Sequence, residues 1–356
     1  MINLSSNYPS APGQEELTRR YMSAVLADPT LDLSAPRPYF GHPPDVESVQ
    51  SALMGPQSEI EGSRCVLTSS GEAALIAALA TVCVGHGMRF VAESWTFPKF
   101  IRALPLFGAS AIPVQMDDHG IVPDSLERVC AQGRLDALYT MPTFHNPLGT
   151  VTPVDRCEAI ATIARRHNLW VIEDNAYAFL ETQARPNVRF FAPERTLQIF
   201  SLSKMISLGL RLGALVMPEI VAARATDYID VAGIPAHPLA TATAARIARE
   251  GQLPALAEAK RAEGAARFEI ARSILGDRAK SLHPHSWHIL MPTPNNQPGT
   301  HFVERARVDA NVAISAAAAY RLDGHDEPMV RVSFGGESAR AAVATGITRL
   351  AGLFAQ

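Results

Sequence analysis

The sequence predicts an α/β protein in which a large, mainly parallel sheet lies between helices and a smaller α+β domain follows. Three observations support this fold class. Short apolar runs alternate with helical patterns through the middle of the chain. Each run is bounded by turn or polar residues, as strands covered on both faces are. After Gly233 the chain changes to long segments rich in Ala, Glu and Arg, which favour helices.

The middle of the chain contains the strands and helices of the large sheet. Apolar runs predict buried strands over 89–92, 111–114, 135–140, 169–173, 196–200 and 214–217. Helical patterns between them cover 71–84, 123–132 and 153–167. Strands that alternate with helices indicate βαβ units, so we expect a largely parallel sheet.

The C-terminal third has a different order of elements. Long helices are predicted over 239–275, with a break near 251–254, and a closing helix over 339–354. Strands are predicted over 287–291 and 330–334. The Ala-rich tract 313–320 is interpreted as helix propensity. The resulting domain ranges are 1–43 for an N-terminal arm that joins the small domain, 44–235 for the large domain and 236–356 for the small domain.

Composition excludes several classes of function. The 356 residues carry a formal net charge of −3 with no basic block, so we expect no nucleic-acid partner. No apolar run approaches the roughly 20 residues of a membrane span, and residues 1–12 lack the pattern of a signal peptide. These features favour a cytoplasmic protein. The four cysteines form no C-x-x-C pair, and we expect no metal site.

The first motif that carries chemistry is S-L-S-K at 201–204, followed by G-L-R-L-G at 209–213. It comes directly after a predicted strand, so Lys204 is expected at the carboxyl edge of the sheet, where α/β proteins bind ligands. A lysine there suits Schiff-base formation with a carbonyl group. Ser201 and Arg211 could both reach a phosphate. The alternative is a surface lysine flanked by turn residues.

The second motif places Asp174 and Tyr177 at the end of the predicted strand 169–173. A carboxylate in this position could pair with a pyridine nitrogen and keep it protonated. The tyrosine could then hydrogen-bond a phenolic oxygen of the same ring. The alternative is an acidic cap on the following helix.

Two further segments lie where predicted elements meet. The N-P-L-G turn at 146–149 could hold the Asn146 side chain in the crevice at the sheet edge, although turns containing N-P are frequent. At 68–72 a strand-like stretch enters a helix. Ser70 can cap that helix, and the N–H groups of Gly71 and Glu72 make an anion site. Nearly any helix start has this pattern, so it is informative only together with the others.

In combination, the four motifs resemble the class I and II aminotransferases, which are fold-type I enzymes of pyridoxal 5'-phosphate (PLP). The resemblance runs from about Leu4 to the C-terminus. The step from Lys204 to Arg211 and the Y-F-G-H-P segment that starts at Tyr39 are most similar to one subgroup. It contains the kynurenine/2-aminoadipate aminotransferases and the aminotransferase-like halves of MocR regulators. The resemblance implies the aspartate-aminotransferase fold, with PLP as the cofactor.

The resemblance also implies roles for individual residues. Lys204 would hold PLP as a Schiff base and shuttle the proton, and Asp174 would pair with the pyridinium nitrogen. Asn146 and Tyr177 would hydrogen-bond the phenolic oxygen, and Phe97 would stack on the ring. The residues that would hold the phosphate are Ser70, Gly71, Glu72, Ser201 and Arg211.

The substrate side and the assembly follow from the same resemblance. Arg331 corresponds to the arginine that clamps the substrate α-carboxylate in a bidentate fork; the alternative is an arginine on a small-domain strand without a ligand. Asn146 and Tyr8 would also line the substrate. Tyr39 would reach the phosphate of the neighbouring subunit, which implies a homodimer with shared sites.

The implied activity is transfer of an amino group from an L-amino acid to a 2-oxo acid. The same apparatus serves lyases, cyclases and oxidases that act on amino acids in specialised metabolism, and these form the alternative. A PLP-sensing regulatory module is a third hypothesis. Such regulators carry an N-terminal DNA-binding domain, and because the resemblance begins almost at Met1 we expect none here.

Overall fold

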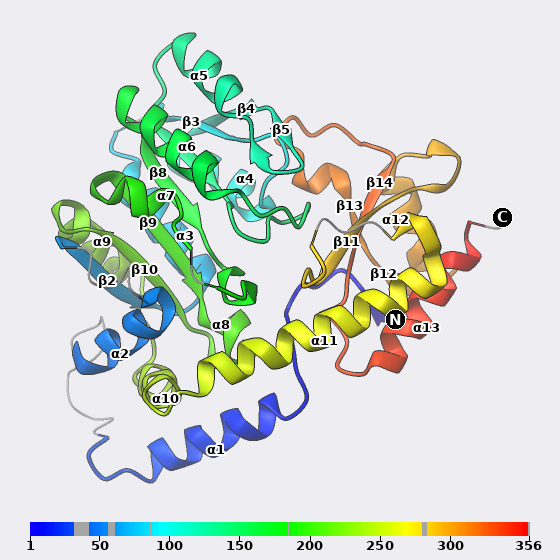
Figure 1. Ribbon diagram of the computed structural model, residues 1–356, viewed down its shortest axis with the longest axis horizontal. Helices are drawn as coiled ribbons and strands as arrows, with labels where there is room; N and C mark the ends of the chain where they lie inside the picture. Colours follow the sequence, from blue (N-terminus) through cyan, green and yellow to red (C-terminus); the bar gives the residue numbers. More distant parts are fainter. Residues whose placement is uncertain (32–42, 56–60, 86, 184, 280–282, 355–356) are drawn as a thin grey trace.

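The computed structural model describes residues 1–31, 43–55, 61–85, 87–183, 185–279 and 283–354 (Figure 1). Its centre is a seven-stranded sheet in the order β2-β10-β9-β8-β7-β3-β4. The strands are β2 (Ser63–Thr68), β3 (Arg89–Glu93), β4 (Ser110–Val114), β7 (Ala137–Thr140), β8 (Trp170–Asp174), β9 (Thr196–Ser201) and β10 (Gly213–Pro218). The six predicted strands are all present in this sheet, and β2 joins them.

The sheet is parallel except at one strand. Neighbours from β4 through β3, β7 and β8 to β9 all run parallel. β10 lies between β9 and β2 and is antiparallel to both. The predicted α/β class with a mainly parallel sheet is therefore confirmed, and the strands of the parallel set end at a common edge.

Helices cover both faces of this sheet because its strands alternate apolar side chains between two clusters. Along β3, Phe90 packs on one face and Val91 on the other. The first face is covered by α3 (Gly71–Val82), α4 (Pro98–Ala103) and α9 (Glu219–Val231). The second face is covered by α5 (Pro123–Ala131), α6 (Val154–Arg166) and α7 (Val188–Phe191). A small hairpin of β5 (Met116–Asp117) and β6 (Gly120–Ile121) precedes α5.

A third apolar cluster forms where β2 and β10 meet the N-terminal helices. It joins Leu67 of β2 and Val216 of β10 to Val49 of α2 (Pro43–Met54) and Ala244 of α10 (Pro238–Arg249). Tyr21 of α1 (Gln14–Leu26) packs into the same cluster. α10 thus packs with the large sheet, and the domain ranges predicted from the sequence stay predictions.

The smaller part of the molecule is built on an antiparallel sheet. Its strands are β11 (His288–Pro292), β14 (Met329–Ser333) and β13 (Ser315–Ala316), in that order. At the N-terminus, β1 (Ile2–Asn3) pairs with β12 (Val312–Ala313), and Leu4 is fully buried in the small-part core. The covering helices are α12 (Gly299–Val308) and α13 (Arg340–Gly352).

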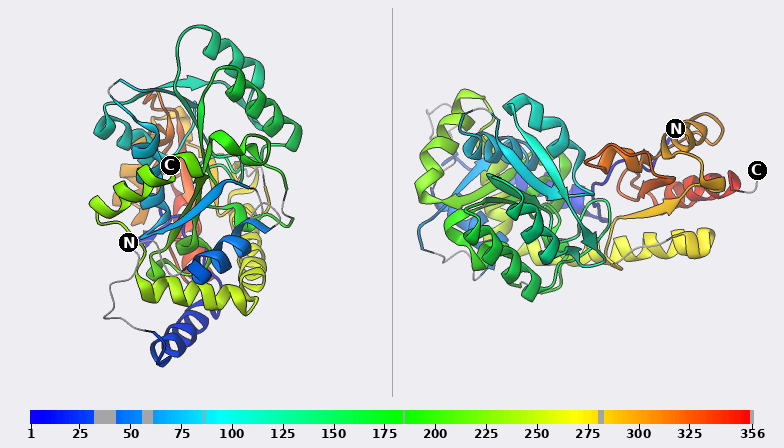
Figure 2. Two further views of the ribbon diagram at one scale, coloured as in Figure 1. Left: turned by 90° about the vertical axis from the view of Figure 1, so that its left-hand side faces the viewer. Right: turned by 90° about the horizontal axis from the view of Figure 1, so that it is seen from above.

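One long helix connects the two parts. α11 (Gln252–Leu275) begins beside α10 under the large sheet and ends against α13 in the small part (Figure 1). The view from above shows the two parts side by side with α11 running between them (Figure 2). Among the described residues, no helix combines the length and apolar character that a membrane crossing needs.

The Ala-rich tract 313–320 corrects one expectation from the sequence. Helix propensity predicted a helix there, but the tract holds the last residue of β12, all of β13 and a short 3₁₀ turn over Ala317–Tyr320. Ser315 and Ala316 pair with β14, so strand pairing in the folded protein overrides the local preference of alanine.

Gly213 offers a direct test of how tightly β10 packs on the start of α3. A Cβ atom at position 213 would overlap the backbone of Ser70 and Gly71, so Gly213→Ala should destabilise the fold. Overpacking typically costs about 1–3 kcal/mol, which lowers the thermal unfolding midpoint by several degrees. Gly209→Ala is the control, because nothing lies within 4 Å of the Cβ that it adds. Equal midpoints for the two variants would contradict this packing.

Candidate active site

Four segments predicted to carry chemistry meet at the carboxyl edge of the large sheet. β2 leads to Ser70 and the start of α3, β7 leads to the turn with Asn146, and β8 ends at Asp174. β9 leads into α8 (Leu202–Met205), a single helical turn that carries Lys204. Parallel strands place their carboxyl ends together, which is where open α/β sheets bind ligands.

The side chain of Lys204 points at two aromatic rings. Its Nζ lies 3.9 Å from the centre of the Tyr177 ring and 5.8 Å from the centre of the Phe97 ring. Burial favours the neutral amine, but the phenol of Tyr177 and the carboxylate of Asp174 together favour the charged form more strongly. The pKa of Lys204 therefore lies above its ordinary value. The arrangement holds a cationic amine close to two aromatic rings and a buried carboxylate.

Asp174 is buried beside this amine, with 4% of its surface exposed. Its Oδ1 accepts a hydrogen bond from the backbone N–H of Ala176 at 3.0 Å, and its Oδ2 accepts one from the hydroxyl of Tyr139 at 2.9 Å. Burial raises the pKa of Asp174, while the charge of Lys204 and the Tyr139 hydroxyl oppose the rise. A buried carboxylate of this kind can hold a proton on a ring nitrogen.

Tyr139 is a site residue that the sequence reasoning missed. It lies inside β7, and its ring stacks on Phe100 at 4.0 Å with the planes 6° apart. In the sequence it has the pattern of a core residue of a strand buried on both faces. The one available signal was its hydroxyl, because a buried tyrosine usually hydrogen-bonds a partner.

The start of α3 provides backbone N–H groups next to Ser201. Ser70 Oγ accepts from the N–H of Ala73 at 3.0 Å, as a capping side chain does. A Cβ on Gly71 would lie only 2.9 Å from Cβ of Ser201, so glycine allows this close approach. The Glu72 side chain is paired with Lys99. A helix start with unused N–H groups beside a hydroxyl is suited to a phosphate.

Arg211 differs in exposure from the other residues predicted to hold the phosphate. Ser70 and Ser201 are buried, whereas the Arg211 side chain is exposed to solvent. Its backbone has a φ of 48°, in the turn that precedes β10. Arg211 thus lies in the turn that leads into β10, and it is exposed to solvent.

Arg331 on β14 closes the cluster from the small part. It is buried with 5% exposure, and its Nη1 donates to Asn146 Oδ1 at 2.8 Å. Nη2 donates to the backbone oxygen of Ser5, and the guanidinium carbon lies 4.8 Å from the centre of the Tyr320 ring. The Nε–H is buried without a hydrogen-bond partner. An unpaired guanidinium donor in this position suits a carboxylate.

The N-terminal arm lies against the same residues. Tyr177 donates its hydroxyl to the backbone oxygen of Asn7 at 3.1 Å, and the Asn7 amide lies 3.0 Å from Nδ1 of His288. The phenol of Tyr8 contributes to the raised pKa of Lys204. Asn7 Oδ1 and His288 Nε2 are buried without partners. The arm therefore brings Tyr8 to the site, and its Asn7 contacts His288 of β11.

Tyr39 lies outside the described residues. Trp95, two residues before Phe97, packs against Arg321, whose guanidinium carbon is 5.2 Å from the indole ring. Among the described residues, no group of three or more His, Cys, Asp or Glu side chains is arranged to hold a metal ion.

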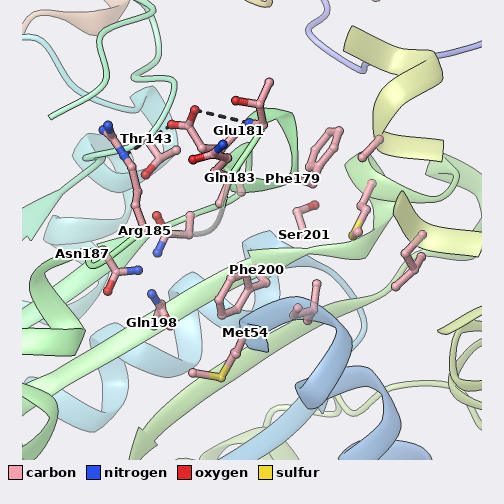
Figure 3. A pocket seen from close by; sticks show the side chains of 18 of the residues that line it. Met54, Thr143, Phe179, Glu181, Gln183, Arg185, Asn187, Gln198, Phe200 and Ser201 are labelled. Carbon is pink, nitrogen blue, oxygen red and sulfur yellow. Dashed lines mark hydrogen bonds and ion pairs between the residues drawn. The ribbon is translucent and has the colours of Figure 1, made fainter. Parts of the chain in front are cut away.

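A separate cavity of about 340 Å³ lies beside the site (Figure 3). Its lining includes Ser201, Phe200, Gln198 and Arg185, while Lys204 is not part of it. Figure 3 shows Ser201 at one side of the cavity and Arg185 at the other. The cavity thus adjoins the candidate site at Ser201.

Comparison with known families and relatives gives a consistent result. The sequence matches the family described as aminotransferase class I and II over residues 1–345. It is 28% identical over 272 residues to the uncharacterized HTH-type transcriptional regulator YdeF of Bacillus subtilis, covering 75% of this chain and 58% of that protein. It is 28% identical over 169 residues to the mitochondrial kynurenine/alpha-aminoadipate aminotransferase of Bos taurus, covering 44% and 39%. The chain therefore spans less than two thirds of either relative.

Solved structures show the same fold. The multiple substrate aminotransferase of Thermococcus profundus superposes with a TM-score of 0.88 at 19% identity, over 99% of this chain and 91% of that chain. LysN, the alpha-aminoadipate aminotransferase of Thermus thermophilus, superposes with a TM-score of 0.87 at 21% identity, over 100% and 92%. The predicted fold type is confirmed by this likeness.

Tyr139 yields a testable prediction for the site. Tyr139→Phe removes the hydroxyl that donates to Asp174 and keeps the stacked ring. A hydrogen bond to a charged group contributes about 1.5–3 kcal/mol, so PLP affinity should fall roughly 10- to 100-fold in an absorption titration. Tyr228→Phe on α9 is the matched control and should bind PLP like the unmodified protein. Equal affinity for the two variants would exclude a role for the Tyr139 hydroxyl.

Proposed function

We propose that this chain, which belongs to the class I and II aminotransferase family, moves an amino group from an L-amino acid to a 2-oxo acid with PLP. The observation that carries the proposal is the position of the Lys204 amine. It faces the rings of Tyr177 and Phe97, and its charge is coupled to the buried carboxylate of Asp174. This is the set of groups that a Schiff-base cofactor with a pyridine ring requires.

The described residues fit PLP at each of its ends. The buried Asp174 carboxylate suits the ring nitrogen, and Phe97 suits the ring face. The close approach of Gly71 to Ser201 leaves helix N–H groups for the phosphate, with Arg211 accessible beside it. When bound, PLP supplies a carbonyl for the amine and a ring that accepts electrons from the substrate.

The protein's own groups would then divide the work. Lys204 Nζ would carry a proton between Cα of the substrate and the carbonyl carbon of PLP. Asp174 would keep a proton on the ring nitrogen. Asn146 and Tyr177 orient the ring by hydrogen bonds to its phenolic oxygen. The Arg331 guanidinium binds the substrate α-carboxylate, and its buried, unpartnered Nε–H supports this role.

The assembly and location that accompany this function are also proposals. A homodimer with shared active sites rests on the resemblance at Tyr39, which lies outside the described residues. A cytoplasmic location rests on composition and on the N-terminal sequence. We propose Tyr8 as a substrate-side residue, which is supported by its influence on the Lys204 amine.

A second candidate is the ligand-sensing part of a transcriptional regulator. The similarity to YdeF over 75% of this chain favours it. A sensing module would bind PLP and an amino acid without releasing an oxo acid. Whether the protein releases an oxo acid therefore distinguishes the enzyme from the sensing module.

The first test follows the absorption of the PLP-loaded protein. We expect a yellow band that Lys204→Ala abolishes, because the chromophore requires the lysine. Single amino acids added without oxygen should bleach the band and yield the matching oxo acid, identified by mass spectrometry. Failure to load PLP would refute the proposal. Binding without any product would favour the sensing module, and elimination or oxygen-dependent products would favour a lyase, cyclase or oxidase.

Arg331 gives a second prediction. Truncating one partner of a buried charged interaction costs about 2–5 kcal/mol, so Arg331→Met should lower kcat/KM for an amino acid by roughly 30-fold or more. Arg331→Lys keeps the positive charge and should recover part of this loss. Recovery should be incomplete, because a lysine ammonium cannot form the bidentate fork. An amine without an α-carboxylate is the control substrate, and its kcat/KM should change little. Equal losses for both substrates would contradict the carboxylate role.

A further inference from the structure

A second lysine is buried directly behind the turn that carries Lys204. Lys260 lies in the first half of α11 and is fully buried. Its Nζ donates to the backbone oxygen of Lys204 at 2.7 Å and to that of Ile206 at 3.3 Å. The ring centre of Phe179 lies 5.7 Å away. Burial lowers the pKa of Lys260 to about 7. Burying an amine at this point therefore costs free energy of folding, which its hydrogen bonds must offset.

The turn around Lys204 explains why such a donor is needed. α8 is a single turn of four residues, and its capping N–H, from Ile206, bonds only to the oxygen of Leu202. The last carbonyl groups of a helix have no partner within it. At the other end of the turn, Ser203 exchanges hydrogen bonds with Leu212. Lys260 supplies the missing donors at the carboxyl end.

We propose that Lys260 is a positioning residue, whose bonds to the Lys204 and Ile206 carbonyls fix the direction in which the Lys204 side chain leaves the backbone. This inference rests on the proposed aminotransferase function. Lys204 has a long, flexible side chain, and its amine must meet the same atoms in each half of the reaction. A displacement of about 1 Å at a reacting group can cost about 100-fold in rate.

The proposal can be separated from a purely structural role by the choice of substitutions. Lys260→Met keeps the unbranched shape and removes every donor, whereas Lys260→Arg keeps a charged side chain with N–H donors. Arg261→Met is the matched control. Arg261 is the next residue of α11 and also donates to two backbone carbonyls, but to those of Phe179 and Glu181.

The first measurement uses the protein without PLP and is independent of turnover. Hydrogen exchange should quicken at the amides of residues 203–207 in Lys260→Met and remain unchanged there in Arg261→Met. Unchanged exchange at 203–207 in Lys260→Met would overturn the proposal. If Lys260→Met does not fold, amide exchange at 203–207 is measured in Lys260→Arg instead. Because this variant keeps hydrogen-bond donors, the proposal predicts exchange close to that of the unmodified protein, and faster exchange would contradict it.

The second measurement uses the PLP-loaded protein. In Lys260→Met we expect kcat to fall roughly 10- to 100-fold with little change in KM, and the pH at which the cofactor band titrates to move. Lys260→Arg should restore part of both effects, and Arg261→Met should show neither. An unshifted titration with normal kcat would overturn the proposal. If the unmodified protein fails to load PLP or to transaminate, the proposed function is refuted. The hydrogen-exchange result then tests the role of Lys260 by itself.

Discussion

The parallel strands of the large sheet end at one edge, and most polar groups of the candidate site depend on that shared edge. β2, β7, β8 and β9 each deliver one segment to it, although these segments lie far apart in the sequence. β10 runs antiparallel between β2 and β9, and Gly213 lets it approach the start of α3 closely. The helix start, the lysine turn and the arginine turn are therefore held together by backbone packing.

Two buried charged side chains, Asp174 and Arg331, complete the site, and each has few hydrogen-bond or charge partners. Asp174 has Tyr139 and the nearby amine of Lys204, and Arg331 has Asn146 together with a backbone carbonyl. α11 contacts the backbone on both sides of the cluster. Its Lys260 binds the carbonyl of Lys204, and its Arg267 donates to carbonyls of residues 334, 337 and 338, just after the strand that carries Arg331. α11 thus contacts backbone at Lys204 and just after the strand of Arg331.

The sequence predicted the sheet and the four motifs because each depends on local patterns. Apolar runs and turn residues define β8 and the segment with Asp174, and a chemically distinctive lysine marks α8. Contacts between segments that are distant in the sequence have no local sequence pattern, so they could not be predicted. Tyr139 has the pattern of a core residue, Lys260 that of an ordinary helix lysine, and the bond from Arg331 to Asn146 joins the small sheet to the large one. At 313–320, pairing with β14 determines the structure against the preference of alanine for helix.

The claim that Lys204 is the residue linked to PLP can be tested by chemical labelling. The protein is loaded with PLP, reduced with borohydride, digested, and mapped by mass spectrometry. The account predicts that the pyridoxyl mass is found on Lys204, and that an amino acid added before reduction removes the label. Labelling of another lysine, such as Lys99 or Lys260, or the absence of any label, would contradict it.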